Sequence, residues 1–235
     1  MRRLTVNTIT QIVTVLGVAY ALKYHYSVAT VNALRWILEP TRIMVEIFTG
    51  HTFRFESYAG YLIDDRTFII AASCAGVNFL IIMFLMLNAG QFYRERRLTW
   101  GHIGISLIIA YVTTLIANTV RIVIALQLLK YDVRIGSFGD EDVHRLEGIV
   151  VYFVFLLLLF FVTEKIADRT RPNPATLLRR ALIPITIYYI ATLAVPLARG
   201  AYAEPAFWQH AMFVLIAPLV IMLPVALVFS RRPSE

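Results

Sequence analysis

The sequence predicts an all-α fold, a polytopic bundle of transmembrane helices. Of the 235 residues, 59% are hydrophobic and only 16% are charged, whereas a soluble domain is about half apolar and about a quarter charged. Several runs approach the roughly 20 apolar residues with which a helix crosses a bilayer. There is no series of alternating ten-residue segments of the kind that builds a transmembrane barrel. We expect one integral membrane domain over residues 1–235, with about six spans, an interfacial or re-entrant helix and a small extracytoplasmic hairpin.

The first span is expected over Leu4–Leu22. It follows Met1-Arg2-Arg3, as a signal peptide would, but no small-x-small cleavage site follows it, which favours an uncleaved span. The next stretch, Val31–Phe48, has apolar residues at helical spacing and four charged residues, which is typical of an amphipathic helix at the membrane interface. Those charged residues are Arg35, Glu39, Arg42 and Glu46.

The segment from His51 to Ile70 has a different pattern. Phe53 and Phe55 alternate with charged residues, and turn-forming residues follow at Gly60 and Asp64-Asp65. This alternation predicts a small hairpin outside the membrane. The remaining spans are expected at Cys74–Phe92, His102–Leu129, Gly148–Val162, Ala181–Leu197 and Ala206–Phe229, the last interrupted by Pro218 and Pro224.

The net charge of +7 favours a membrane topology rather than a nucleic-acid partner. Basic residues gather in the segments between alternate spans, as the positive-inside rule requires. We therefore expect a multi-pass protein of the bacterial inner (plasma) membrane, in contact with lipids, with both termini cytoplasmic. This topology places Cys74 and the loop Lys130–Leu146 on the outer side.

Cys74 is the only cysteine, which excludes an internal disulfide and a cysteine-cluster metal site. A lone buried cysteine is most often a small apolar side chain. Its expected place at the start of a span favours a reactive thiolate instead, because a helix N-terminus stabilises that form. Asn78, four residues later, is expected on the same helix face, and Gly76 permits close approach of another chain segment.

Arg121 is expected inside the third span, where a charged side chain is costly and is therefore a candidate functional residue. Asn118, three residues earlier, shares its helix face. The alternative interpretation is a pair of polar side chains that tie helices together.

His144 is expected in a loop at the outer mouth of the fourth span, near the membrane level of Cys74. Gly148, four residues later, lets a neighbouring helix approach. Glu147 could orient the imidazole, but we expect a solvated charge. Together Cys74, Arg121 and His144 suit acyl transfer, with a thiolate nucleophile, an imidazole for proton transfer and a guanidinium for the oxyanion.

Other enzyme classes lack support. The chain has no HExxH, GxSxG or Walker-type pattern, so zinc protease, serine hydrolase and NTPase functions are not indicated. We expect no metal and no cofactor.

Three ordered blocks resemble the exosortase/archaeosortase family. They are Cys74-Ala75-Gly76, then Asn118-Thr119-Val120-Arg121, then His144 followed at four residues by Gly148. The stretch Ser73–Phe79 is most similar to the exosortase K subgroup. The resemblance covers roughly residues 55–165.

The resemblance implies a membrane-embedded cysteine protease/transpeptidase. Such an enzyme cleaves the C-terminal sorting signal of a secreted protein through a thioacyl intermediate and transfers the protein to an acceptor, whose identity the sequence does not indicate. It implies Cys74 as nucleophile, Arg121 as substrate or oxyanion group and His144 as acid/base, with Asn118 in support. A monomer is expected to suffice.

Three alternatives stay open at this point. One is a membrane cysteine acyltransferase or simple protease that uses the same thiol. Another is a transporter or channel with Arg121 as a substrate or anion site. The third is a scaffold in which the polar residues are structural.

Overall fold

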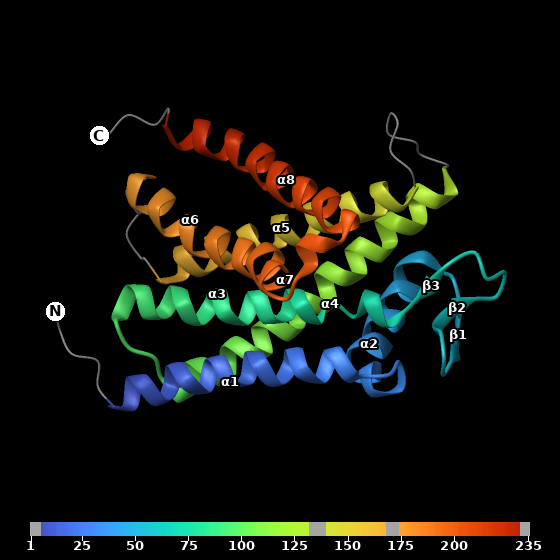
Figure 1. Cartoon of the computed structure of the whole chain (residues 1–235), viewed down its shortest axis with the longest axis horizontal. Helices are drawn as coiled ribbons and strands as arrows, with labels where there is room; N and C mark the ends of the chain where they lie inside the picture. The colour runs from blue at the N-terminus through green and yellow to red at the C-terminus, as the bar shows by residue number, and fades with distance from the viewer. Residues whose placement is uncertain (1–5, 132–139, 168–173, 231–235) are drawn as a thin grey trace. The chain divides into compact units, whose positions relative to one another are not determined.

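The computed structural model describes residues 6–131, 140–167 and 174–230, and helices dominate these residues (Figure 1). Six of the described helical segments are long and apolar enough to cross a membrane. The predicted all-α class of membrane protein is thereby confirmed. The segments are Val6–Val28, Ala72–Glu95, Trp100–Lys130, Asp142–Ala167, Arg179–Ala198 and Phe207–Pro224.

The chain divides into two compact units, Met1–Gly139 and Asp140–Glu235, which are described separately. The prediction of one membrane domain stays a prediction. Residues 132–139 of the predicted outer loop, 168–173 of the basic loop and the tail 231–235 lie outside the described residues.

Three long helices form the frame of the first unit. Helix α3 (Val77–Glu95) packs against both α1 (Val6–Val28) and α4 (Trp100–Lys130), and α1 lies alongside α3 in Figure 1. The Thr99 side chain caps α4 by accepting a hydrogen bond from the His102 amide, which satisfies one of the unpaired donors of a helix start.

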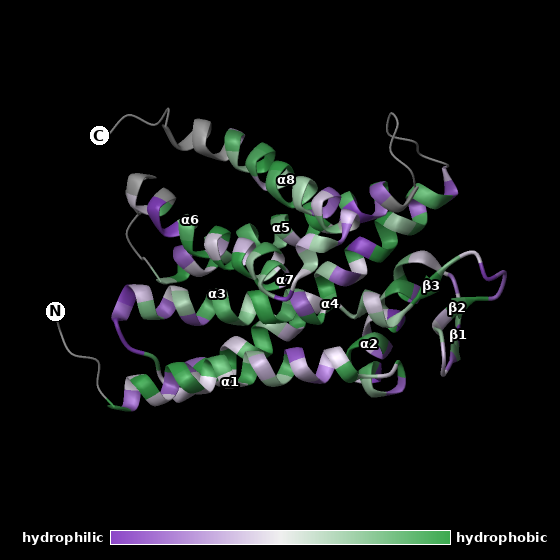
Figure 2. Cartoon of the chain, viewed as in Figure 1, coloured by the Kyte–Doolittle hydropathy of each residue, from purple (hydrophilic) through white to green (hydrophobic). Residues whose placement is uncertain are grey.

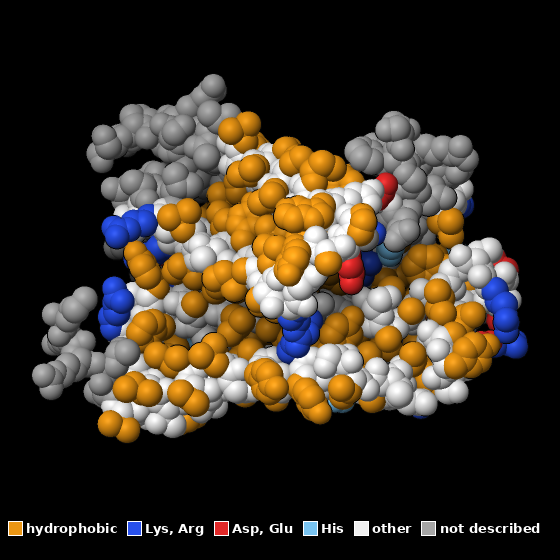
Figure 3. Space-filling view, viewed as in Figure 1, with side chains coloured by type: hydrophobic (Ala, Val, Ile, Leu, Met, Phe, Trp, Pro, Cys, Tyr) orange, Lys and Arg blue, Asp and Glu red, His pale blue; other side chains and the backbone are white. Residues whose placement is uncertain are grey.

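Hydrophobic residues run along much of these helices (Figure 2), and apolar side chains lie on the face of the molecule that Figure 3 shows. Leu16 and Tyr20 of α1 and Ile108 of α4 are more than half exposed. In water such surface would be costly, whereas in a bilayer it contacts lipid tails. The exposed apolar surface is thus the outward face of a membrane protein.

The predicted amphipathic helix is α2 (Arg35–Thr49), which follows the short turn η1 (Asn32–Leu34). Its buried face is Ile37, Leu38, Thr41 and Val45, and it packs against α4. Trp36 stacks on Tyr111 of α4 with ring centroids 5.8 Å apart, and the Tyr111 hydroxyl donates to the Trp36 carbonyl at 2.7 Å. The amphipathic character is confirmed, and its position at the membrane interface stays a prediction.

The segment after α2 forms the predicted hairpin and adds a third strand. Strands β1 (Phe53–Glu56), β2 (Gly60–Ile63) and β3 (Ile69–Ile70) form an antiparallel sheet in that order. Gly60 has φ +130, and a Cβ there would lie 2.3 Å from the Ile70 carbonyl oxygen. A glycine is therefore needed where β2 turns beside β3.

A polar network joins α2 to this sheet. Arg42 bonds to Glu39 at 2.7 Å and to Glu46 at 2.5 Å. The Tyr61 hydroxyl of β2 donates to Glu39, and the Phe53 amide of β1 donates to Glu46 at 2.8 Å. The hydrogen bond from Tyr61, followed by those from Arg42, holds the pKa of Glu39 below its usual range, and burial raises the pKa of Tyr61.

The second unit is a separate group of helices. Helix α5 (Asp140–Ala167) packs against α6 (Pro174–Tyr189) and α8 (Pro205–Ser230). Between α6 and α8 the chain forms a π turn, a short helix and a 3-10 turn, which are η3 (Ile190–Ala194), α7 (Val195–Ala198) and η4 (Ala201–Ala203). Glu164 is buried and pairs with Arg180 at 2.7 Å, and Phe153 meets the Tyr188 ring edge to face.

Two predictions about this unit were wrong. The outer loop was expected to reach Leu146, but α5 begins at Asp140, so the acidic stretch is helical. The last span was expected to break at Pro218 and Pro224, yet α8 continues through both. Prolines are tolerated in membrane helices because neighbouring groups can satisfy the freed carbonyls.

Removal of the Tyr61 hydroxyl tests the network between α2 and the sheet. The network stabilises the carboxylate form of Glu39 and so lowers its pKa in the folded protein. The contribution of Glu39 to the free energy of unfolding is therefore fully present above its usual pKa, and it is lost as the pH falls through the lower pKa of the folded state. Tyr61→Phe should raise the pKa of Glu39, so that the stability is lost at higher pH, and it should lower the local stability by about 1 kcal/mol. The rate of hydrogen exchange at the Phe53 backbone amide, compared between variant and wild type over a pH series, measures this change.

The matched control is Tyr58→Phe, because Tyr58 is 78% exposed in the same hairpin. It should leave exchange at Phe53 close to wild type. Equal protection in both variants at every pH would contradict the role of Tyr61.

Candidate functional site

Cys74 lies on a short 3-10 turn, η2 (Ala72–Ala75), between β3 and α3. Its amide donates to the Ala71 carbonyl at 2.9 Å. Gly76 follows with φ +69, a left-handed conformation that a residue with a Cβ adopts at a cost of about 1 kcal/mol. Gly76 is thus explained by its backbone conformation, which starts α3 at Val77.

Cys74 lies at the start of the apolar span Ala72–Glu95, as expected, on a 3-10 turn that leads into α3. One detail of the expected geometry was wrong. Asn78 does not share a helix face with Cys74, because the backbone changes conformation at Gly76. The Asn78 side chain is exposed and accepts a hydrogen bond from Lys23 of α1 at 2.7 Å.

Cys74 is only 7% exposed and belongs to the main apolar cluster of the first unit. The cluster combines residues of α2, the sheet, η2, α3 and α4, including Leu34, Ile70, Ala75 and Ile122. The turn that carries the thiol is therefore fixed on several sides by packed side chains.

Asn118 of α4 is fully buried, and its side-chain nitrogen donates to the Cys74 carbonyl at 2.5 Å. This hydrogen bond joins two of the three sequence blocks across 44 residues. Asn118 bonds to the backbone carbonyl oxygen of Cys74, so the thiol group takes no part in this hydrogen bond. Asn118 therefore positions the segment that carries Cys74.

Arg121 lies three residues after Asn118, so the two are neighbours along α4, and its side chain is half-buried. Asn118 thus holds the Cys74 turn against α4, the helix that also carries Arg121.

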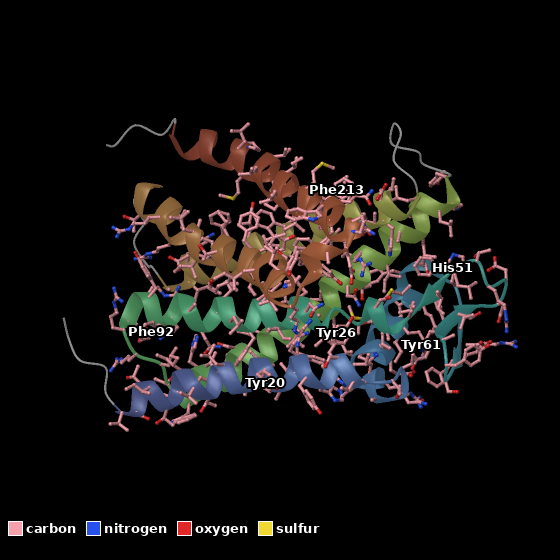
Figure 4. The ribbon with its side chains drawn as sticks, viewed as in Figure 1. Tyr20, Tyr26, His51, Tyr61, Phe92 and Phe213 are labelled. Carbon is pink, nitrogen blue, oxygen red and sulfur yellow. The ribbon has the colours of Figure 1, made fainter. Side chains whose placement is uncertain are left out.

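Helix α1 also contributes to this region, which the sequence analysis missed. Tyr26 packs against the apolar cluster that contains Cys74, and Figure 4 shows it between α1 and α3. The Lys23 ammonium lies 5.7 Å from the centre of the Tyr26 ring. The signal in the sequence was a lysine in an apolar helix, three residues before a tyrosine.

His144 belongs to the second unit, in α5 rather than in a loop. Its Nδ1 lies 3.5 Å from Oε2 of Glu147. The Glu147 side chain is only 6% exposed, so the expectation of a solvated charge was wrong. This arrangement suits a carboxylate that orients an imidazole. Gly148 is buried one turn further along α5.

The chain matches no family model, no curated protein and no solved structure. The fold defines a helical, polytopic membrane protein. Its resemblance to exosortases stays a prediction that depends on the motif residues.

Loss of the Asn118 amide tests how the Cys74 turn is held. Asn118→Leu leaves a buried carbonyl without this donor, which costs about 1 to 3 kcal/mol. The turn should open more often, so neutral N-ethylmaleimide should modify Cys74 about tenfold faster in purified protein.

The control is Thr114→Val. Thr114 is buried on the same helix one turn earlier, and its hydroxyl donates to the Ala110 carbonyl of α4 itself. Loss of the Thr114 hydroxyl should change the rate of Cys74 modification little. A rate in Asn118→Leu no greater than in Thr114→Val would contradict the positioning role.

Proposed function

We propose that the protein is a membrane-embedded cysteine protease/transpeptidase of the exosortase type. It cleaves C-terminal sorting signals of secreted proteins through a thioacyl intermediate and transfers the protein to an acceptor. The observation that best supports the proposal is the hydrogen bond from Asn118 to the Cys74 carbonyl. It joins two motif blocks at a buried cysteine, beside a half-buried arginine in a membrane helix.

The first half of the proposed reaction is acylation. The Cys74 thiolate attacks the carbonyl carbon of the scissile amide, and the carbon–nitrogen bond then breaks. The departing amine takes a proton from the imidazolium of His144. Negative charge develops on the carbonyl oxygen, and the Arg121 guanidinium stabilises it.

The second half transfers the acyl group. A nucleophile on the acceptor attacks the thioester carbon, the carbon–sulfur bond breaks and the acceptor loses a proton to His144. With water in that place, the product is a free carboxylate and the enzyme acts as a protease. The thiolate is restored, so the cycle needs no redox partner.

The role of His144 in this scheme comes from motif order, and its contact with Glu147 supports it. A buried carboxylate whose oxygen lies 3.5 Å from the imidazole Nδ1 can fix the orientation of the ring. Glu147 would thus be a positioning residue.

The proposal also includes an orientation. Basic residues between alternate spans favour cytoplasmic termini and an outward-facing Cys74. This orientation suits an enzyme whose substrates have already crossed the membrane.

Processing of a secreted protein with a hydrophobic, basic-ended C-terminal signal tests the proposal. Cys74→Ala should abolish the mobility shift from precursor to product while the variant is recovered, folded, from the membrane. His144→Ala should slow processing at least a hundredfold, and added imidazole should restore part of the rate, because a small base can occupy the vacated space.

His51→Ala is the matched control, since His51 is an exposed histidine outside the motif blocks. It should process at the wild-type rate, with no effect of imidazole. Processing by Cys74→Ala or by Cys74→Ser at the wild-type rate would reject the nucleophile and favour a transporter with Arg121 as the anion site.

A further inference from the structure

The sheet of the first unit has two edges, and one of them continues into the turn that carries Cys74. The strand order is β1-β2-β3, so β1 and β3 each pair with β2 on one side alone. The other side of an edge strand presents backbone N–H and C=O groups that can pair with a further strand. Within the described residues, no strand occupies the outer side of β3.

The backbone groups of β3 alternate between the two sides of the strand. In an antiparallel pair, only every second residue bonds to the partner strand. The Ile63 amide donates to the Phe68 carbonyl at 3.2 Å, so the next bonded pair along the ladder is Tyr61 with Ile70. Ile69 lies between these bonded positions, and its N–H and C=O therefore point to the open edge. Ile69 is 37% exposed.

The opposite edge of the sheet is already capped. By the same alternation, Phe53 of β1 points its N–H away from β2, and this N–H donates to the Glu46 carboxylate of α2 at 2.8 Å. No contact among the described residues caps Ile69 in this way. The edge of β3 is therefore the one that keeps its outward backbone groups available.

The open edge leads directly to the thiol. Cys74 follows Ile70 by four residues, so their Cα atoms lie at most about 14 Å apart. The Cys74 amide donates to the Ala71 carbonyl at 2.9 Å, which joins the turn to the end of the strand. Ser73, immediately before the thiol, is exposed. Since a strand rises about 3.3 Å per residue, a short extended peptide can reach from Ile69 to the thiol.

We propose that the outer edge of β3 is a peptide-binding site, which takes an extended segment of the substrate as an added strand beside Cys74. The N–H and C=O of Ile69 exchange hydrogen bonds with the peptide backbone, and such main-chain bonds supply the affinity in strand addition. The role of this peptide as a substrate rests on the proposed function. Its binding as a strand is a separate property of the sheet edge.

Peptide reagents that alkylate the thiol test strand addition without any catalysis. The parent reagent is acetyl-Thr-Val-Thr-Val-Ala chloromethyl ketone, with which the Cys74 thiolate forms a carbon–sulfur bond while chloride leaves. A series of variants carries one N-methyl group each, moved along the peptide backbone one amide at a time. Rates are measured by mass spectrometry of the Cys74 peptide, on the full chain in detergent, and are divided by the rates with free cysteine.

The normalised rates should alternate along the series in wild type, because neighbouring amides of a bound strand point in opposite directions. Methylation of an amide that bonds to Ile69 should slow alkylation by about threefold to tenfold, the factor that one hydrogen bond contributes. Methylation of either neighbouring amide should change the rate less than about twofold, because that N–H points away from the sheet.

Ile69→Pro removes the outward N–H without removing a bond of the ladder between β2 and β3, and proline is tolerated where an edge N–H faces outward. It should slow the parent reagent by about threefold to tenfold and abolish the alternation. The matched control, Ile69→Val, keeps the amide and should behave as wild type. Methyl methanethiosulfonate, which is small and neutral, should modify Cys74 alike in all three proteins.

The wild-type series needs no variant, so it decides the matter whether or not Ile69→Pro folds. Uniform rates along that series, alternation that persists in Ile69→Pro, or no reaction of Cys74 with any peptide reagent would each overturn the proposal. Alternation in a protein that processes no sorting signal would reject the proposed function alone.

Discussion

The hydrogen bond between Asn118 and the Cys74 carbonyl is the contact on which the candidate site depends. Cys74 lies on a 3-10 turn outside the α-helix, and backbone groups outside a helix need another partner when they are buried in a membrane protein. Asn118 provides that partner from a helix 44 residues further along the chain. It holds the thiol-bearing turn against α4 and so sets its place relative to Arg121 on the same helix.

Charge is the second constraint on the site. A lysine and an arginine in largely apolar helices are costly, and membrane proteins keep such residues where they bind or react with something. Lys23 bonds to Asn78 at the start of α3, and Arg121 lies one turn from Asn118, whose side chain holds the Cys74 turn. A functional role for these charges stays a proposal.

The fold was largely predictable because its signals are local. Apolar runs of sufficient length indicated the spans, helical spacing indicated α2, and alternation around Phe53 indicated the hairpin. Asn118 and Arg121 were found because polar residues in a span are conspicuous. These features depend on the chemistry of neighbouring residues in sequence, which is visible without coordinates.

The remaining details depend on contacts between distant residues. The start of α3 depends on the left-handed conformation at Gly76, which separates the 3-10 turn of Cys74 from α3 and leaves Asn78 on a different face. The burial of Glu147 depends on packing in the second unit, where α5 begins earlier than expected. The partnership of Lys23 with Asn78 spans 55 residues, and no local pattern predicts such a pair.

The most direct test of the central claim is the mass of the Cys74 peptide after rapid acid quenching of cells that process a sorting signal. The account predicts an acyl adduct on Cys74 that neutral hydroxylamine removes, because a thioester is cleaved by that nucleophile. Cys74→Ser should give either no adduct or an ester that resists the same treatment. Efficient processing with unmodified Cys74 at every time point would contradict a thioacyl intermediate and, with it, the proposed role of the site.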